Sequence, residues 1–199
     1  MILIDPELDL SRAADALNPV SAKPSAGPAA APGRKLPAKP SRLPSTPTLA
    51  RTLAQFLTRA QAAVPLRGQV TVLLTSDAAI RDLNRRFRGK NKPTDVLSFP
   101  AADLVQDQEK GDLAISVEMA RRQAAEQGHA LTCELKVLIL HGVLHLAGHD
   151  HETDTGEMLR RERSLRARLG LPPGLIERAG SELVHHGGRV SKPARRRKP

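Results

Sequence analysis

Aromatic residues are nearly absent from this 199-residue sequence, which contains no tryptophan, no tyrosine and three phenylalanines. Apolar residues still make up 40% of the chain, so a core can form, and its side chains must be mainly aliphatic. Proteins that hold single strands on rows of aromatic rings need residues that this chain has in very small number. The composition therefore excludes wholesale disorder and leaves little material for a binding site of that kind.

Cysteine and long apolar runs are also scarce. Cys133 is the single cysteine, which excludes an internal disulfide framework and fits a reducing compartment. No run approaches 18 apolar residues, and residues 1–10 carry three carboxylates, unlike a secretory leader. We expect a soluble, cytoplasmic protein without a membrane segment.

The net charge of +10 is concentrated in two stretches of the chain. Residues 11–46 contain six lysines or arginines and one acid, and residues 185–199 contain six and no acid. These stretches carry +5 and +6, so the rest of the chain carries −1 of the total. Such basic stretches favour polyanions without reading their sequence, although disordered tails of this kind can also serve solubility alone.

Proline marks the domain boundaries. Eight of the 16 prolines lie between Ala16 and Pro47, in a mixture that can hold neither a helix nor a central strand. We predict a single catalytic domain formed by residues 1–10 and 47–180. Residues 11–46 are then a disordered basic insertion, and residues 181–199 form a disordered basic C-terminal tail.

The remaining sequence alternates between short apolar runs and segments with helical periodicity, which is typical of an α+β domain with a small sheet of about four strands. One expected helix has Ile80, Leu83 and Phe87 on one side, with Ser76 as its cap and Gly89 after its end. The expected strands are residues 2–4, 70–74, 96–99 and 111–116, and the expected helices are residues 47–64, 77–88, 117–127, 132–147 and 156–169.

The segment His141–His151 (HGVLHLAGHDH) contains the strongest chemical signal. His141 and His145 are four residues apart on a predicted helix, so both imidazoles leave from one face. Gly148 allows the chain to turn back and bring His151 in as a third ligand. Three neutral imidazoles with one open position are typical of a catalytic metal site. The alternative is three ordinary histidines, but an apolar helix gains nothing from two buried imidazoles that lack a partner.

The same spacing occurs in metzincin proteases, so a metallopeptidase is the first alternative. Those enzymes have a glutamate directly after the first histidine, where it acts as general base. Gly142 occupies that position here and cannot transfer a proton. Phosphodiester cleavage depends more on charge neutralisation and alignment, so the missing carboxylate favours phosphate chemistry.

Arg88 is the candidate for binding phosphate. It ends a predicted helix beside Gly89 and precedes a loop that contains Pro93 and Thr94. A guanidinium at this place can project into a cleft and grip a phosphate in bidentate fashion. Its neighbours Arg85 and Arg86 are more simply explained as solvated surface residues, and position alone does not separate Arg88 from them.

Together with residues 87–100 (FRGKNKPTDVLSFP) and 111–116 (GDLAIS), the histidine segment resembles the YbeY family of bacterial single-strand-specific endoribonucleases, the rRNA maturation factors. The resemblance covers about residues 1–10 and 47–170. It implies a compact α+β domain with a small mixed sheet. It also implies an enzyme that matures 16S rRNA ends, acts in ribosome quality control and associates with the small ribosomal subunit.

By this resemblance, His141, His145 and His151 are the metal ligands and Arg88 is the functionally important arginine of the cleft. We expect one Zn²⁺ per chain, held by the three histidines and a water. The substrate is expected to be single-stranded RNA in rRNA precursors, and no DNA is expected. The stretch 11–46 and the arginine-rich end depart from the usual family pattern.

Other charged residues have simpler interpretations. Asp150 is expected either to form the turn or to accept a hydrogen bond from a ligating imidazole.

A second alternative function is a ribosome-assembly factor in which the zinc is structural and no catalysis occurs. The helix at 156–169 is read as a solvated face that can also touch RNA phosphates; its charged residues are Glu157, Arg160, Arg161, Glu162, Arg163, Arg166 and Arg168.

Overall fold

The computed structural model describes residues 1–8, 10, 45–101, 109–149 and 154–172. The predicted insertion at residues 11–46, apart from Ser45 and Thr46 at its end, and the predicted tail lie outside these residues. So do Asp150 and His151.

The four expected strands form one mixed sheet with the order β1-β2-β4-β3. Strands β1 and β2 are parallel, β2 and β4 are parallel, and β3 runs antiparallel to β4 at the edge. Because β3 and β4 follow one another in the chain, the antiparallel pair needs only a short connection. The strands are β1 (Ile2–Ile4), β2 (Gln69–Thr75), β3 (Val96–Pro100) and β4 (Glu109–Ser116).

Local sequence signals account for the ends of most helices. The Ser76 and Ser116 side chains each accept a hydrogen bond from a backbone N–H in the first turn of α3 and α4. Gly89 and Gly128 follow the same two helices in the left-handed conformation. The helices are α2 (Thr46–Ala63), α3 (Asp77–Arg88), α4 (Val117–Gln127), α5 (Leu131–Leu146) and α6 (Glu157–Leu169).

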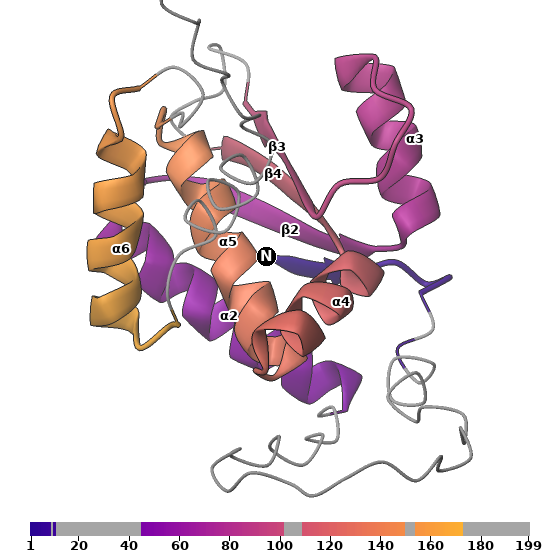
Figure 1. The fold of residues 1–199 in the computed structure, drawn as a ribbon, viewed down its shortest axis with the longest axis horizontal. Helices are drawn as coiled ribbons and strands as arrows, with labels where there is room; N and C mark the ends of the chain where they lie inside the picture. The colour runs from indigo at the N-terminus through magenta and orange to yellow at the C-terminus, as the bar shows by residue number, and fades with distance from the viewer. Residues whose placement is uncertain (9, 11–44, 102–108, 150–153, 173–199) are drawn as a thin grey trace, which may run out of the picture.

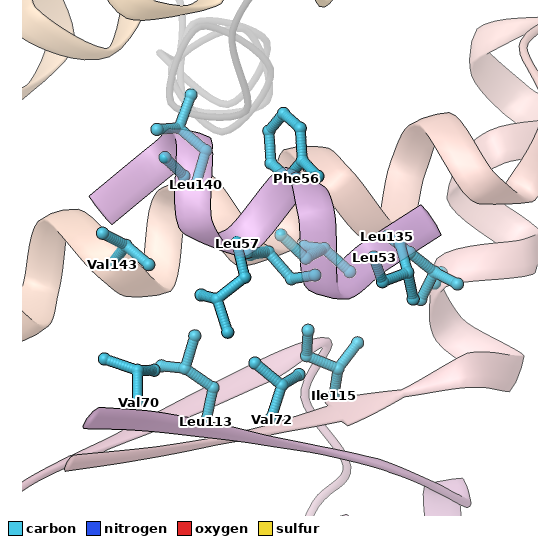
Figure 2. Packing of buried hydrophobic residues seen from close by; sticks show 14 of the residues in the cluster. Leu53, Phe56, Leu57, Val70, Val72, Leu113, Ile115, Leu135, Leu140 and Val143 are labelled. Atoms are coloured by element: carbon cyan, nitrogen blue, oxygen red, sulfur yellow. The ribbon is translucent and has the colours of Figure 1, made fainter. Parts of the chain in front are cut away.

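The sheet separates two cores of unequal size (Figure 1). Helix α3 packs on one face, where Ile80 contacts Leu97 and Ala114. The other four helices gather on the opposite side and form the large core with the sheet. Figure 2 shows side chains of β2 and β4 directed toward α2 and α5 across this core, namely Val70, Val72, Leu113 and Ile115.

Helix α5 is the central element of the large core. Nearly all of its residues from Leu135 to Leu144 are buried, and it contacts α2, α4, α6 and the sheet. A helix that is apolar on all sides must be enclosed, and this explains why the histidine pair starts from a rigid support. The expected metal-bearing helix is therefore the central helix of the domain.

Phe87 lies on the predicted apolar side of α3 but is not part of the core. This residue continues the apolar stripe of α3, as predicted, but its side chain is 63% exposed while Ile80 is fully buried. The small core on this face consists of Ile80, Leu97 and Ala114, with Leu83 and Phe99 packed against it, and Phe87 lies at its border. There Phe87 contacts Phe99 alone among the aromatic rings of the described residues.

Among the residues that the structure describes, no single helix has the length and hydropathy to cross a membrane. Helices α4 and α5 pass that test only as a pair, and they are bent by 112° at their junction.

Candidate metal centre

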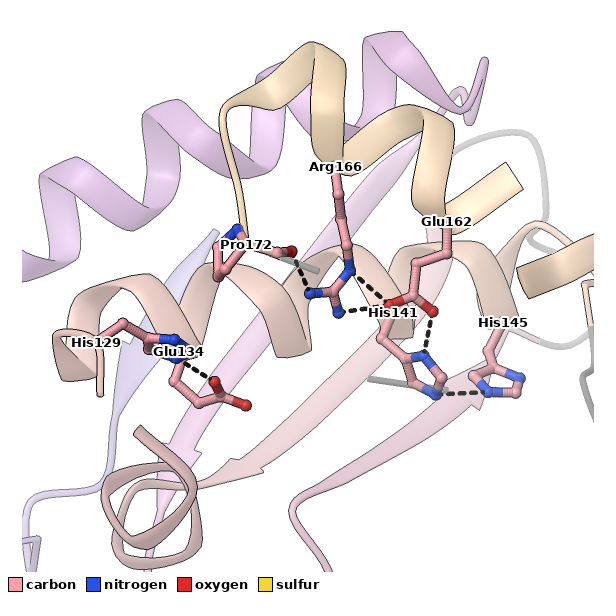
Figure 3. Close-up of polar contacts among 7 residues, drawn as sticks. All are labelled: His129, Glu134, His141, His145, Glu162, Arg166 and Pro172. Carbon is pink, nitrogen blue, oxygen red and sulfur yellow. Dashed lines mark hydrogen bonds and ion pairs between the residues drawn. The ribbon is translucent and has the colours of Figure 1, made fainter. Parts of the chain in front are cut away.

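His141 and His145 face one another near the C-terminal end of α5. Their Nε2 atoms are 3.1 Å apart, and their ring centroids are 4.7 Å apart with nearly perpendicular planes. His141 is 6% exposed, whereas His145 is only partly buried. The predicted spacing of four residues thus brings both rings to one face of the helix, as Figure 3 shows.

Helix α6 supplies a carboxylate to this pair. Glu162 is fully buried, and one of its oxygens lies 3.1 Å from His141 Nδ1. Its other oxygen accepts a hydrogen bond from Arg166 Nε at 2.7 Å, one turn further along α6. Arg166 is itself 1% exposed and donates to the carbonyl of Pro172 at 3.0 Å. Figure 3 shows this chain of contacts running from Pro172 to His145.

The charges of this chain fix the protonation of Glu162. Burial raises the pKa of its carboxyl, but the hydrogen bond from His141 and the positive charge of Arg166 outweigh burial and lower the pKa to about 2. Glu162 is therefore an anion at neutral pH and can only accept hydrogen bonds. His141 Nδ1 must carry the proton, which leaves the lone pair of a neutral His141 on Nε2.

This arrangement fits a divalent cation. Two imidazole ligands at 2.0–2.1 Å in tetrahedral geometry have nitrogen atoms roughly 3.3 Å apart, close to the separation seen here. Ligating imidazoles usually donate their other ring N–H to a carboxylate, which is the bond that Glu162 accepts from His141. Within the described residues, no set of three His, Cys, Asp or Glu side chains completes a metal cluster. His151, the predicted third ligand, lies outside that part of the chain.

Gly142, which follows the first histidine, is required by the packing of α5 on the sheet. A Cβ atom at this position would lie 2.7 Å from Leu113 Cδ2 and 2.9 Å from Leu113 Cδ1. Leu113 belongs to β4 and is completely buried, so it has little room to move. The glutamate that serves metzincins as general base therefore has no space here, and this geometry argues against the metallopeptidase alternative.

Arg88 lies on the other side of the sheet from the histidines. It is the last residue of α3 and its side chain is exposed. In the described part of the chain it makes no hydrogen bond or ion pair with His141 or His145. Phosphate binding by Arg88 therefore stays a prediction from the sequence.

The two helices that carry the predicted site residues, α3 with Arg88 and α5 with the histidines, both contact the β3–β4 pair near the end of β3. The ring of Phe87, next to Arg88, contacts the ring of Phe99 with centroids 5.2 Å apart. From the opposite face, Leu146 follows His145 and lies over Gly111, where a Cβ would be 2.9 Å from Leu146 Cδ2. Gly111 pairs with Pro100, the last residue of β3. Figure 1 shows α3 and α5 ending on the same side of the molecule.

The prediction of a solvated α6 face is wrong for Glu162 and Arg166, which are buried. The signal that could have found them is helical spacing, because Glu162 and Arg166 share a stripe with the apolar Met158 and Leu165. The buried side of α6 therefore includes a charged pair, and a sequence pattern of mixed charges hides it.

Known proteins of one family are similar to this chain over most of the described residues. The family profile described as Endoribonuclease YbeY matches residues 41–170. The chain belongs to the YbeY endoribonuclease family. It is 59% identical over 128 residues to the Endoribonuclease YbeY of Koribacter versatilis, covering 64% of this chain and 82% of that protein. It is 50% identical over 129 residues to the corresponding protein of Solibacter usitatus, covering 65% and 85%.

A solution structure of TM1509 from Thermotoga maritima is 27% identical in sequence, with a TM-score of 0.45. It covers 77% of this chain and 96% of that protein. The YbeY assignment rests on the family profile and the two relatives, and it confirms the resemblance seen in the three sequence motifs.

Proposed function

We propose that this YbeY-family protein is a metal-dependent endoribonuclease that cleaves single-stranded RNA during maturation of 16S rRNA precursors. It acts in the cytoplasm, in association with the small ribosomal subunit, and takes part in ribosome quality control. The observation that carries the proposal is the paired imidazoles of α5, with His141 held by the buried Glu162, in a chain of this family.

His141, His145 and His151 would hold the cation, with Zn²⁺ the expected metal. When bound, such a cation acts as a Lewis acid toward a phosphoryl oxygen and lowers the pKa of a coordinated water. Glu162 keeps the proton of His141 on Nδ1, so that Nε2 stays available as a ligand. Arg166 neutralises the buried charge of Glu162 and prevents the carboxylate from turning away.

Arg88 would bind the scissile phosphodiester and stabilise the negative charge that develops on it. A planar guanidinium suits two phosphate oxygens at once. Support for this role comes from the neighbouring Phe87, whose ring contacts Phe99 of β3, and from Leu146 of α5, which lies over Gly111 beside the end of β3. Among the described residues, the carboxylate that contacts the histidine pair is that of Glu162, and both of its oxygens are engaged, one by His141 and one by Arg166. Proton transfer is therefore assigned to solvent.

A paired assay tests this function against the metallopeptidase. Zn²⁺-loaded and Mn²⁺-loaded protein is incubated with single-stranded RNA, double-stranded RNA and casein. We expect cleavage of the single strand only, and loss of cleavage and of bound metal in His141→Ala. Cleavage of casein that depends on His141, with RNA left intact, would overturn the proposal.

The same assay tests Arg88 and the structural-zinc alternative. Arg88→Glu should abolish cleavage while the melting temperature and metal content stay unchanged. Arg59→Glu, an equally exposed arginine on α2, is the matched control and should cleave normally. Cleavage retained in Arg88→Glu would remove this residue from the site.

The structural-zinc alternative makes a different prediction. If no preparation cleaves RNA and His145→Ala loses stability and ribosome binding together, the metal is structural.

A further inference from the structure

The C-terminal end of α3 and the loop after it form a strongly basic surface, here called the α3 surface. It contains six lysines and arginines and one acid, and all of them are exposed. Asp82 pairs with Arg85 at 3.3 Å and offsets one positive charge. The members of the α3 surface are Arg81, Arg85, Arg86, Phe87, Arg88, Lys90 and Lys92.

Phe87 is the unusual member of this surface. It is one of three phenylalanines in the chain, and at 63% it is the most exposed large apolar side chain of the described residues. Its ring meets Phe99 edge to face, with an interplanar angle of 72°. This contact orients the Phe87 ring while most of its area remains in water. A single exposed apolar side chain is common, but an exposed ring that is oriented by a second ring and surrounded by cations offers a face on which a nucleic-acid base can stack.

Hydrogen bonds hold this surface in place on both sides of the loop. Asn84 is buried in α3 and donates through its side-chain amide to the carbonyl of Lys92 at 2.8 Å. Gly89 ends the helix in the left-handed conformation. At the far end of the loop, Asp95 accepts a hydrogen bond from Gln123 of α4 at 3.0 Å. A surface fixed in this way loses little entropy when it binds a ligand.

The α3 surface also adjoins the candidate metal centre along β3. Phe87 contacts Phe99, and the following residue, Pro100, lies beside the end of α5 that bears His145. A strand that crosses the end of β3 would therefore touch both. Cations that track phosphates, combined with a ring that stacks on a base, are the means by which proteins bind single strands without double-helical structure.

We propose that the α3 surface is the platform that binds single-stranded RNA beside the metal centre, with one unpaired base stacked on Phe87 and the flanking phosphates held by Arg86 and Lys90. The inference rests on the proposed ribonuclease function and adds to it the site that selects unpaired nucleotides. A base inside a duplex cannot reach this ring because its two faces are covered by its neighbours. A protein partner bound through Phe87 is the alternative outcome of the test.

The test measures binding of a fluorescent single-stranded RNA by anisotropy, in the full chain carrying His141→Ala so that the RNA stays intact. Salt of roughly 0.2 M reduces non-specific contacts. Phe87→Ala should weaken binding about 5- to 100-fold, the range for loss of one stacked base. Phe87→Leu should lose nearly as much, and Phe87→Trp should restore binding, because stacking needs a ring and not merely apolar volume.

Matched controls come from exposed residues elsewhere. Leu3→Ala removes an exposed apolar side chain of β1, and Arg59→Ala removes an exposed cation of α2; neither should change binding. A series of RNAs with one abasic nucleotide should show a position at which Phe87→Ala has no further effect. Wild-type affinity in Phe87→Ala, or full binding by Phe87→Leu, would overturn the platform and assign Phe87 to a protein contact.

These outcomes are distinct from failure of the ribonuclease function itself. Absence of RNA cleavage by the metal-loaded wild type removes the proposed function. Cleavage by the wild type, with binding insensitive to every Phe87 substitution, removes only the platform.

Discussion

The two ring nitrogens of His141 have different partners, and this difference determines what the residue can do. Nδ1 is held by Glu162 at 3.1 Å, while Nε2 faces the second histidine. A neutral imidazole in water exchanges between its two tautomers, and only one of them presents Nε2 to a metal. Glu162 removes this ambiguity before any cation binds, so the pair of histidines is preorganised.

Substitution of Glu162 by glutamine tests that preorganisation. The variant keeps the size of the side chain but loses the negative charge that fixes the His141 tautomer. We expect affinity for Zn²⁺ to fall about 10- to 100-fold, as for other partners of metal-binding histidines. The measurement is competition with a chromophoric chelator. Glu157→Gln, at an exposed position of the same helix, should bind Zn²⁺ like the wild type. Equal affinities in both folded variants would contradict this role.

The same variant has a predicted signature in acid. The pKa of Glu162 is lowered from 4.5 to about 2 on folding, so its ionised form stabilises the folded state fully above pH 4.5. That contribution, on the order of 3 kcal/mol, is lost progressively as pH falls from about 4.5 toward 2. Urea unfolding of metal-free protein should therefore show a steeper loss of stability in this window for the wild type than for Glu162→Gln. Parallel curves would argue against a buried, ionised Glu162.

At the scale of elements, the critical contact is that of α5 with β4. The helix approaches the sheet so closely at Gly142 that no side chain fits above Leu113. This close approach places the C-terminal end of α5, which bears the histidines, over the end of β3 and the start of β4. The packing of α5 on β4 therefore explains the glycine at position 142 without reference to the chemistry of the site.

Alanine at position 142 should destabilise the protein even though alanine favours helices. The added methyl group overpacks the core at a cost of ~1–3 kcal/mol, whereas the gain in helix propensity is ~1 kcal/mol. A net loss of up to about 2 kcal/mol is expected in urea unfolding. Combination with Leu113→Ala makes room for the methyl group, so Gly142→Ala should then be neutral or stabilising. The same loss in both backgrounds would show that Leu113 is not the obstacle.

The sequence predicted the elements well because their ends carry local signals, such as Ser76 and Gly89 around α3. It also predicted that His141 and His145 share a face, since that follows from helical geometry alone. The contact of Glu162 with His141 joins two helices, and no local pattern reports which helices pack together. The sequence placed Phe87 on the apolar side of α3, but it could not show that this ring is exposed, because the cover over that side depends on tertiary packing. His151 stays a prediction.

At the scale of the whole molecule, the net positive charge lies in stretches of the chain that are not part of the predicted catalytic domain. The stretches 11–46 and 185–199 account for +11, so the remainder, with its structured site, carries a small negative charge. Six of the 19 lysines and arginines of that remainder lie on the α3 surface, where Asp82 is the one acid among them. Specific positioning of RNA is therefore assigned to the α3 surface, and the arginine-rich end is expected to add affinity that does not depend on RNA sequence.

Replacement of the six lysines and arginines of residues 185–199 by glutamine tests this division while keeping the chain length constant. Each cation that neutralises a phosphate contributes about 0.7 to the slope of log affinity against log salt for a single strand. The variant should bind single-stranded RNA more weakly at low salt and with a shallower slope, and the two proteins should converge at high salt. Cleavage positions in a defined RNA should be unchanged, because the α3 surface and the metal centre remain intact. A shift in cleavage position would mean that the basic end guides the substrate. An unchanged salt slope would mean that the basic end does not contact the RNA.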